Sequence, residues 1–200
     1  MKVLGLTGGI GSGKTAASQV LAELGAVVID ADRVGHETYL PGTPGWDQVV
    51  AAFGRGVVAP DGTIDRKRLG AIVFADPAKL AQLNAIVHPL IRDAVASRIG
   101  SLRAAGQGDA VVVEAALLVE ARWDALVDEV WVVTARPDVI EHRLMAQRNL
   151  DRAAIAARIK AQISDRERAA SAAVLIDNSA SLEALRERLT TLWRERVLSG

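Results

Sequence analysis

Residues 8–15 read Gly8-Gly9-Ile10-Gly11-Ser12-Gly13-Lys14-Thr15, which matches the phosphate-binding pattern G-x-x-x-x-G-K-[ST] at every fixed position. Glycines let the backbone curl so that successive N–H groups converge on phosphate oxygens, which a Cβ would obstruct. An apolar run precedes the stretch and an amphipathic run follows it, as the strand–loop–helix context of the motif requires. The stretch therefore predicts a nucleotide-binding loop.

The residues that end this loop carry the expected chemistry. Lys14 would place a compact positive charge beside the β- and γ-phosphates of a nucleotide, and the Thr15 hydroxyl would ligate Mg²⁺. The helix that begins there adds the positive end of its dipole. We assign the nucleotide contacts of the loop to Gly9, Gly11, Ser12, Gly13, Lys14, Thr15 and Ala16.

Five short apolar runs predict the strands of a sheet. They cover residues 3–6, 26–29, 110–113, 129–133 and 173–176, and they are continuous rather than alternating, as in buried parallel strands. Helical patterns lie between them, at residues 14–24, from Asp76-Pro77 toward Gly106, at 138–148 and at 182–197. The alternation predicts an α/β fold with a mainly parallel five-stranded sheet flanked by helices.

Residues 36–106 interrupt this alternation with turn signals and helical patterns. We interpret them as a helical insertion between the second and third strands. The chain would then be a single domain, residues 1–200, with a nucleotide-binding core of residues 1–35 and 107–200 and a helical lid near residues 140–170.

Composition excludes several classes of protein. The chain has 24 Lys and Arg against 24 Asp and Glu, so no global charge attracts it to nucleic acid or to an anionic membrane. It contains no cysteine, which excludes disulfides and thiolate metal sites. Its three histidines are scattered along the sequence. No targeting segment or membrane-spanning run is visible, and we expect a cytoplasmic protein.

The second apolar run ends in Ile29-Asp30-Ala31-Asp32, which places two carboxylates where α/β proteins assemble their chemistry. Asp30 and Asp32 would share one face if the strand continued that far. One of them could accept the proton of an attacking hydroxyl or hold Mg²⁺ through water. The alternative is that both are solvated turn residues.

The loop alone is compatible with a kinase, a GTPase, a motor or a binding module. The base-recognition sequence N-K-x-D of GTPases is absent, and a motor would need more chain for coupling domains. A binding module without turnover would need neither Asp32 nor arginines in the lid, such as Arg143 and Arg148. These observations favour a small-molecule kinase with a P-loop kinase fold.

Several motifs together resemble the dephospho-coenzyme A kinase family, in order from residue 6 to residue 178. They are residues 6–14 and 28–32, Asp61-Gly62 with Arg66 and Leu69, Phe74, Leu83-Asn84, His88-Pro89-Leu90-Ile91, Leu117-Leu118 with Glu120, Arg143, Arg148, Arg158 with Gln162, and Ile176-Asp177-Asn178. The chain departs from the family pattern at Ala116, where a proline is typical, and in the spacing between Arg143 and Arg148.

The resemblance implies transfer of the ATP γ-phosphate to the ribose 3′-hydroxyl of dephospho-CoA, the last step of coenzyme A synthesis. We expect a monomer or weak homo-oligomer. Asp32 would be the general base, and Lys14 would stabilise the transferring phosphoryl group. The nucleotide would also contact Arg143, Arg148 and Asn178, the last near the adenine. The acceptor would contact Asp32, His88, Arg92, Leu117, Leu118 and Glu120.

Some alternatives stay open at this point, among them another small-molecule or nucleoside monophosphate kinase of the P-loop class. Which of Arg143 and Arg148 contacts phosphate is not decided, and both could belong to a solvated helix face. His88 precedes a proline, which could mark a break or kink in its helix, and could simply be packed or solvated. Glu114 could orient Mg²⁺-bound water or cap a neighbouring helix.

Overall fold

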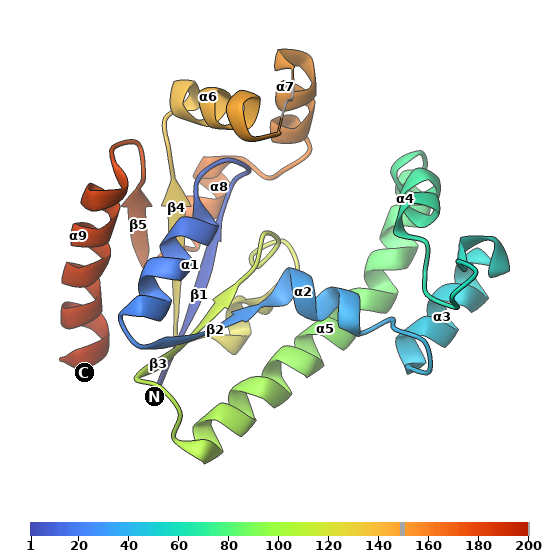
Figure 1. Cartoon of the computed structure of the whole chain (residues 1–200), viewed down its shortest axis with the longest axis horizontal. Coiled ribbons are helices and arrows are strands. Elements are labelled where there is room, and N and C mark those ends of the chain that lie inside the picture. The colour runs from blue at the N-terminus through green and yellow to red at the C-terminus, as the bar shows by residue number, and fades with distance from the viewer. Residues whose placement is uncertain (149–150, 200) are drawn as a thin grey trace. The chain divides into compact units, whose positions relative to one another are not determined.

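The computed structural model describes residues 1–148 and 151–199, and of residues 147 and 148 the backbone alone. Across these residues five strands form one parallel sheet in the order β2-β3-β1-β4-β5 (Figure 1). They are β1 (Lys2–Gly8), β2 (Ala26–Asp30), β3 (Ala110–Glu114), β4 (Glu129–Thr134) and β5 (Val174–Asp177). All five predicted strands are confirmed.

The three central strands β1, β3 and β4 form where they do because their side chains are buried on both faces of the sheet. Val111, Val112 and Val113 in β3 have no exposed surface. The register pairs Leu6 with Glu114 and Asp30 with Glu114, so the first three strands end at the same edge. That edge carries the polar residues of the candidate site.

Two helices, α1 (Lys14–Glu23) and α9 (Leu182–Trp193), cover one face of the sheet (Figure 1). Their apolar stripes share one core with the strands, in which Leu21 and Leu189 have no exposed surface. Trp131 in β4 and Trp193 in α9 belong to this core. A short π-helical turn, η3 (Arg194–Leu198), follows α9.

Four further helices follow β3 and β4 in the described part of the chain. They are η2 (Trp123–Leu126), α6 (Pro137–Arg148), α7 (Arg152–Lys160) and α8 (Asp165–Ala170). Ser164 caps α8: its hydroxyl accepts a hydrogen bond from the N–H of Glu167, whose carboxylate accepts one from the N–H of Ser164.

The chain separates into two compact units, Met1–Asp30 with Ile99–Gly200, and Ala31–Arg98. The second unit holds α2 (Ala31–Glu37), α3 (Pro44–Phe53), η1 (Arg55–Val57), α4 (Arg66–Phe74) and most of α5 (Pro77–Ala105). Its extended pairing is one isolated bridge, between Val58 and Ile64. Helix α5 runs for 29 residues through Pro89, because the rest of so long a helix outweighs the one backbone bond a proline removes.

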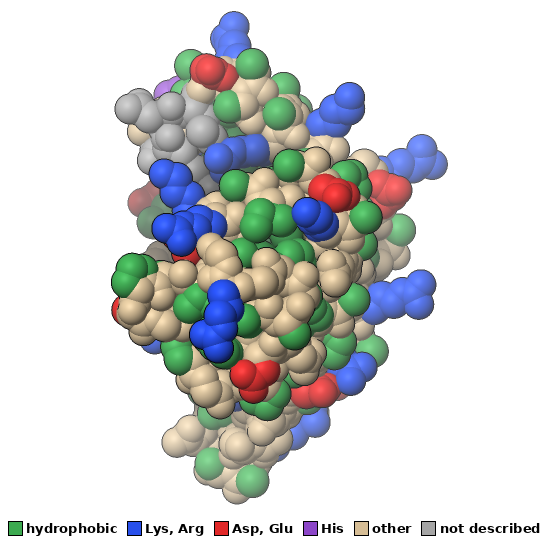
Figure 2. Space-filling view, turned by 90° about the vertical axis from the view of Figure 1, so that its right-hand side faces the viewer, with side chains coloured by type: hydrophobic (Ala, Val, Ile, Leu, Met, Phe, Trp, Pro, Cys, Tyr) green, Lys and Arg blue, Asp and Glu red, His purple; other side chains and the backbone are tan. Residues whose placement is uncertain are grey.

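Within the described residues, no helix is both long enough and apolar enough to span a lipid bilayer. Figure 2 shows a face on which lysine and arginine side chains stand apart from one another, with acidic side chains between them. This mixture agrees with the balanced charge of the sequence.

Candidate nucleotide site

The phosphate loop joins β1 to α1 and depends on glycine at particular positions. Gly11 and Gly13 have φ of 75° and 96°, a left-handed conformation that other residues rarely adopt. A Cβ on Gly13 would lie 2.1 Å from Nδ2 of Asn178, and one on Gly8 would lie 2.3 Å from the carbonyl oxygen of Val133. The loop therefore needs glycine both for its curvature and for the close approach of its neighbours.

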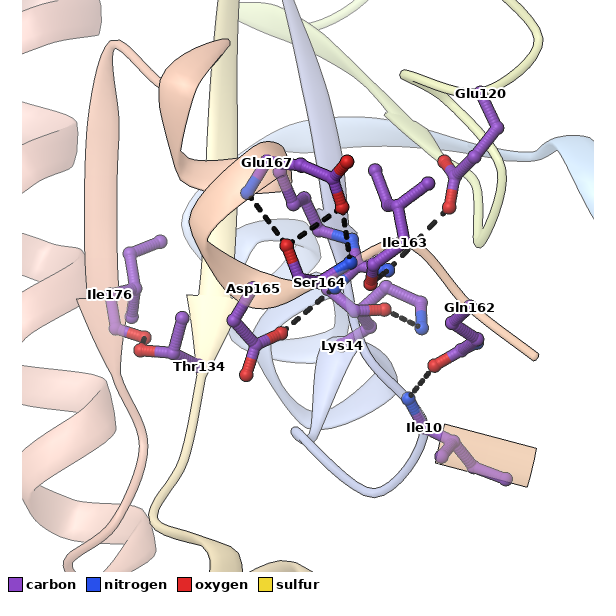
Figure 3. Close-up of polar contacts among 12 residues, drawn as sticks. Ile10, Lys14, Glu120, Thr134, Gln162, Ile163, Ser164, Asp165, Glu167 and Ile176 are labelled. Atoms are coloured by element: carbon purple, nitrogen blue, oxygen red, sulfur yellow. Dashed lines mark hydrogen bonds and ion pairs between the residues drawn. The ribbon is translucent and has the colours of Figure 1, made fainter. Parts of the chain in front are cut away.

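The Lys14 side chain folds back over the loop. Its ammonium group donates a hydrogen bond of 2.9 Å to the carbonyl oxygen of Gly8 (Figure 3). This places the positive charge over the first half of the loop, and α1 begins where the second half of the loop ends. The arrangement is the one that receives a chain of phosphates, with the cation at one end and a helix N-terminus at the other.

Two hydroxyl groups of α1 contact the carboxylate of Glu114. The Thr15 hydroxyl donates a hydrogen bond of 3.2 Å to Oε1 of Glu114, and the Ser18 hydroxyl lies 2.6 Å from Oε2. Glu114 is the last residue of β3, beside β1 in the sheet. Of the two alternatives for Glu114, the structure favours the carboxylate beside Thr15, since both partners are hydroxyl groups and not the N–H groups of a helix end.

Asn178 and Arg143 hold the loop from the other side. Nδ2 of Asn178, a buried residue, donates a hydrogen bond of 2.8 Å to the carbonyl oxygen of Ser12. Arg143 donates to the carbonyl oxygen of Asn178 at 2.9 Å and lies 3.5 Å from that of Ser12. Both residues thus contact the loop itself, and their contacts with adenine and phosphate stay predictions. The side chain of Arg148 lies outside the described residues.

Gln162, Asp165 and Arg168 contact the first half of the loop and were not among the predicted site residues. Oε1 of Gln162 accepts a hydrogen bond of 2.9 Å from the N–H of Ile10 (Figure 3). A Cβ on Gly9 would lie 3.5 to 3.6 Å from polar atoms of all three side chains. The sequence signalled Gln162 only as a family match and gave no signal for Arg168.

A cavity of about 190 Å³ opens beside this half of the loop. Its apolar wall includes Ile10, Ile140 and Ile159, and its polar wall is formed by Gln162, Asp165 and Arg168. The cavity lies wholly within the unit that contains the sheet.

Three predicted acceptor residues lie on the segment after β3. Leu118 has no exposed surface and packs against Gly5, so a contact with an acceptor would require the segment after β3 to move. Leu117 is 39% exposed and is available for a contact. Glu120 forms an ion pair with Arg168, with 3.5 Å between Oε1 and Nη2.

The other predicted acceptor residues belong to the second unit. The strand β2 ends at Asp30, and Asp32 lies exposed in the first turn of α2, so the two carboxylates do not share one strand face. The reason is that β2 pairs with β3 only as far as Asp30, and the helix begins at once. His88 is half-buried, and burial lowers its pKa. Arg92 is exposed and donates to Asp93 at 2.8 Å.

A parallel sheet in this strand order, with a glycine loop after β1, Lys14 over the loop and a hydroxyl–carboxylate pair beside it, defines a P-loop kinase. The family model of dephospho-CoA kinase matches residues 2–184. The chain belongs to this family.

Individual relatives agree with this membership. The chain is 46% identical over 196 residues to the dephospho-CoA kinase of Geobacter sulfurreducens, covering 98% of this chain and 99% of that one. It is 48% identical over 198 residues to the dephospho-CoA kinase of Streptomyces avermitilis, covering 98% and 95%. The structure of dephospho-CoA kinase from Campylobacter jejuni has the same fold, with a TM-score of 0.74, 24% identity and 98% of each chain covered.

Proposed function

We propose that the chain transfers the γ-phosphoryl group of ATP to the ribose 3′-hydroxyl of dephospho-CoA, with Asp32 as general base and Mg²⁺ held at Thr15 and Glu114. Family membership gives the overall reaction: the chain is a kinase that phosphorylates dephospho-CoA in the final step of coenzyme A synthesis. The observation that carries the finer proposal is the Thr15–Glu114 pair beside the Lys14-covered loop.

The loop supplies the donors for the phosphates. Its N–H groups and the ammonium of Lys14 neutralise charge that spreads over the phosphoryl oxygens as the reaction proceeds. Asn178 and Arg143 fix the Ser12 carbonyl, so the curved backbone is already formed before the nucleotide arrives. Preorganised donors of this kind contribute most to a phosphoryl transfer, because they need no rearrangement at the moment of reaction.

The residues beside the loop fit Mg²⁺. The ion takes oxygen ligands and keeps several of its waters, so one hydroxyl and one nearby carboxylate are a sufficient protein contribution. The Thr15 hydroxyl would bind it directly, and Glu114 would hold one of its waters. When bound, the ion neutralises charge on the β- and γ-phosphates.

Asp32 would take the proton of the 3′-hydroxyl. In the proposed step, that oxygen forms a bond with the γ-phosphorus, the bond from this phosphorus to the β–γ bridging oxygen breaks, and ADP leaves. The position of Asp32 two residues beyond β2, exposed at the start of α2, supports this role. We keep His88, Arg92, Leu117, Leu118 and Glu120 as proposed acceptor contacts. A monomer or weak homo-oligomer in the cytoplasm is likewise part of the proposal.

A panel of acceptors tests the proposed function. Purified protein receives ATP, Mg²⁺ and either dephospho-CoA, a nucleoside monophosphate or shikimate, and ADP release is followed in each case. Of the three acceptors, we expect only dephospho-CoA to give efficient turnover. The Asp32→Asn variant should lose nearly all of this activity. A preference for a nucleoside monophosphate, or an active Asp32→Asn variant, would contradict the proposal.

A further inference from the structure

Arg168 is a buried cation that the reaction described above does not use. Only 1% of its side chain is exposed, although it lies on the short helix α8 near the surface. Its Nη1 donates to Oδ1 of Asp165 at 2.9 Å, and its Nη2 lies 3.4 Å from the carbonyl oxygen of Ile163. Arginine is rarely buried so completely unless its charge is compensated and its position matters.

Glu120 supplies the compensation from another part of the chain. It lies in the segment after β3, and its Oε1 is 3.5 Å from Nη2 of Arg168. Both carboxylate oxygens of Glu120 are buried, and among the described residues neither accepts a hydrogen bond. An ion pair with Arg168 is therefore what keeps this buried carboxylate compensated, and the pair ties α8 to the segment after β3.

The part of the chain that Arg168 fixes is the turn between α7 and α8, residues 161–164. The arginine reaches the carbonyl oxygen of Ile163 from one side of this turn and Asp165 from the other. Gln162 lies in the same turn and accepts the hydrogen bond from the N–H of Ile10. The position of Arg168 thus sets the distance of Gln162 from the phosphate loop.

Gln162 covers a particular edge of the loop. The Lys14 ammonium lies at the carbonyl of Gly8, and this lysine reaches the β- and γ-phosphates in P-loop proteins. The neighbouring N–H of Ile10 and the Cα of Gly9 consequently lie at the end of the loop where the terminal phosphate sits. Gln162, Asp165 and Arg168 lie beside that end and form the polar wall of the cavity next to it.

We propose that Arg168 is a positioning residue for phosphoryl transfer. By bridging Glu120 and Asp165 it holds Gln162 on the N–H of Ile10, and this closes the terminal-phosphate end of the loop to water. The inference rests on the proposed function, since a kinase must keep water from competing with its acceptor for the phosphoryl group.

The test measures coenzyme A and ADP formation side by side, with ATP, Mg²⁺ and dephospho-CoA. Arg168→Met should lower kcat for transfer, on the order of 100-fold, as expected when a reacting group is misplaced. It should also release more ADP than coenzyme A, because water then takes part of the phosphoryl groups. Arg168→Lys should recover part of both losses. Arg186→Met, which removes an exposed pair with Glu23, is the matched control and should behave as the wild type.

A second variant separates positioning from a structural role. Gln162→Leu breaks the contact with Ile10 and leaves the buried charges in place, so it tests the same contact even if Arg168→Met fails to fold. We expect Gln162→Leu to reproduce the loss of kcat and the excess of ADP. The double variant should be no worse than the more severe single variant, because both act through one contact.

Three results would overturn the inference. They are wild-type kcat and equal amounts of ADP and coenzyme A in Gln162→Leu, the same outcome in a folded Arg168→Met, and multiplicative losses in the double variant. A wild-type protein that makes no coenzyme A would instead refute the proposed function. The two failures are therefore distinguishable in a single set of assays.

Discussion

Single residues of the phosphate loop are held by side chains that lie far along the chain. Asn178 and Arg143 fix the carbonyl of Ser12, and Gln162 fixes the N–H of Ile10. Each contact replaces a hydrogen bond with water by one of fixed direction, so the loop keeps its curvature without a ligand. The nucleotide then binds to donors that are already in place.

Lys14→Ala should lower kcat/KM. The decrease should correspond to a loss of about 3–4 kcal/mol of transition-state stabilisation, which is typical for removal of one key electrostatic donor. The reason is that the ammonium beside Gly8 neutralises charge on the phosphoryl group. Steady-state kinetics with dephospho-CoA measures the effect. Arg188→Ala, which removes an exposed cation from α9, is the control. An unchanged kcat/KM in Lys14→Ala would place this lysine outside the site.

Gly13→Ala should abolish the rise in melting temperature that ADP gives the wild type. The new Cβ would meet Nδ2 of Asn178 at 2.1 Å at a φ of 96°, so the loop must distort. Bound ligand at about 100 times its Kd stabilises a protein by about 2.7 kcal/mol, which thermal melting detects readily. Gly106→Ala is the matched control, because Gly106 also has positive φ but no atom lies within 4 Å of the added Cβ. An intact ADP shift in Gly13→Ala would contradict this account.

Secondary-structure elements bring the functional groups to the carboxyl ends of the strands. At the opposite ends of the strands, a cluster of polar contacts holds the C-terminal helix to the sheet. Glu114 ends β3 and Asp30 ends β2, and the register places them side by side. At the other end, Glu129 begins β4 and accepts hydrogen bonds from Lys2 at 2.7 Å and from Trp131 at 2.9 Å. Lys2 also donates to the carbonyl oxygen of Arg196 in η3, so the cluster fastens the C-terminal helix to the sheet.

Glu129→Gln should make the stability of the protein less sensitive to acid. Burial alone would raise the pKa of Glu129, but the hydrogen bonds from Lys2 and Trp131 and the charges of Lys2 and Arg196 lower it overall. A carboxylate with a lowered pKa contributes stability above its unfolded pKa and loses it as the pH falls through the folded value. The wild type should therefore lose melting temperature faster than Glu129→Gln between about pH 5 and pH 3. If the melting temperatures of the two proteins fell in parallel as the pH is lowered, the hydrogen bonds and charges around Glu129 would not contribute to stability.

For the molecule as a whole, the sequence predicted the sheet, the phosphate loop and the family. Continuous valine runs such as residues 110–113 and the loop of residues 8–15 carry local signals that tertiary contacts do not override. The contacts of Asn178, Gln162 and Arg168 with the loop could not be predicted, because they join residues more than 150 positions apart or depend on where a short helix packs. The same holds for Glu120, which pairs with Arg168.

The end of a strand could not be predicted from the sequence pattern either. The alternation of Asp30 and Asp32 suggested one shared face if the strand continued, but the pairing with β3 stops at Asp30 and α2 begins at Ala31. Hydrogen bonding to a neighbouring strand decides where a strand ends, and a single sequence does not show its neighbour. Pro89 is a similar case, since a local proline signal was outweighed by the length of α5.

The most direct test of the account is the identity of the phosphorylated product. Protein, Mg²⁺, ATP labelled at the γ-phosphate and dephospho-CoA are incubated together, and the product is analysed by mass spectrometry and ³¹P NMR. We expect the label to appear as a phosphomonoester on the ribose 3′-oxygen, in amounts equal to the ADP formed, and Asp32→Asn to produce almost none. Label recovered only as inorganic phosphate, or at another position of the acceptor, would contradict it.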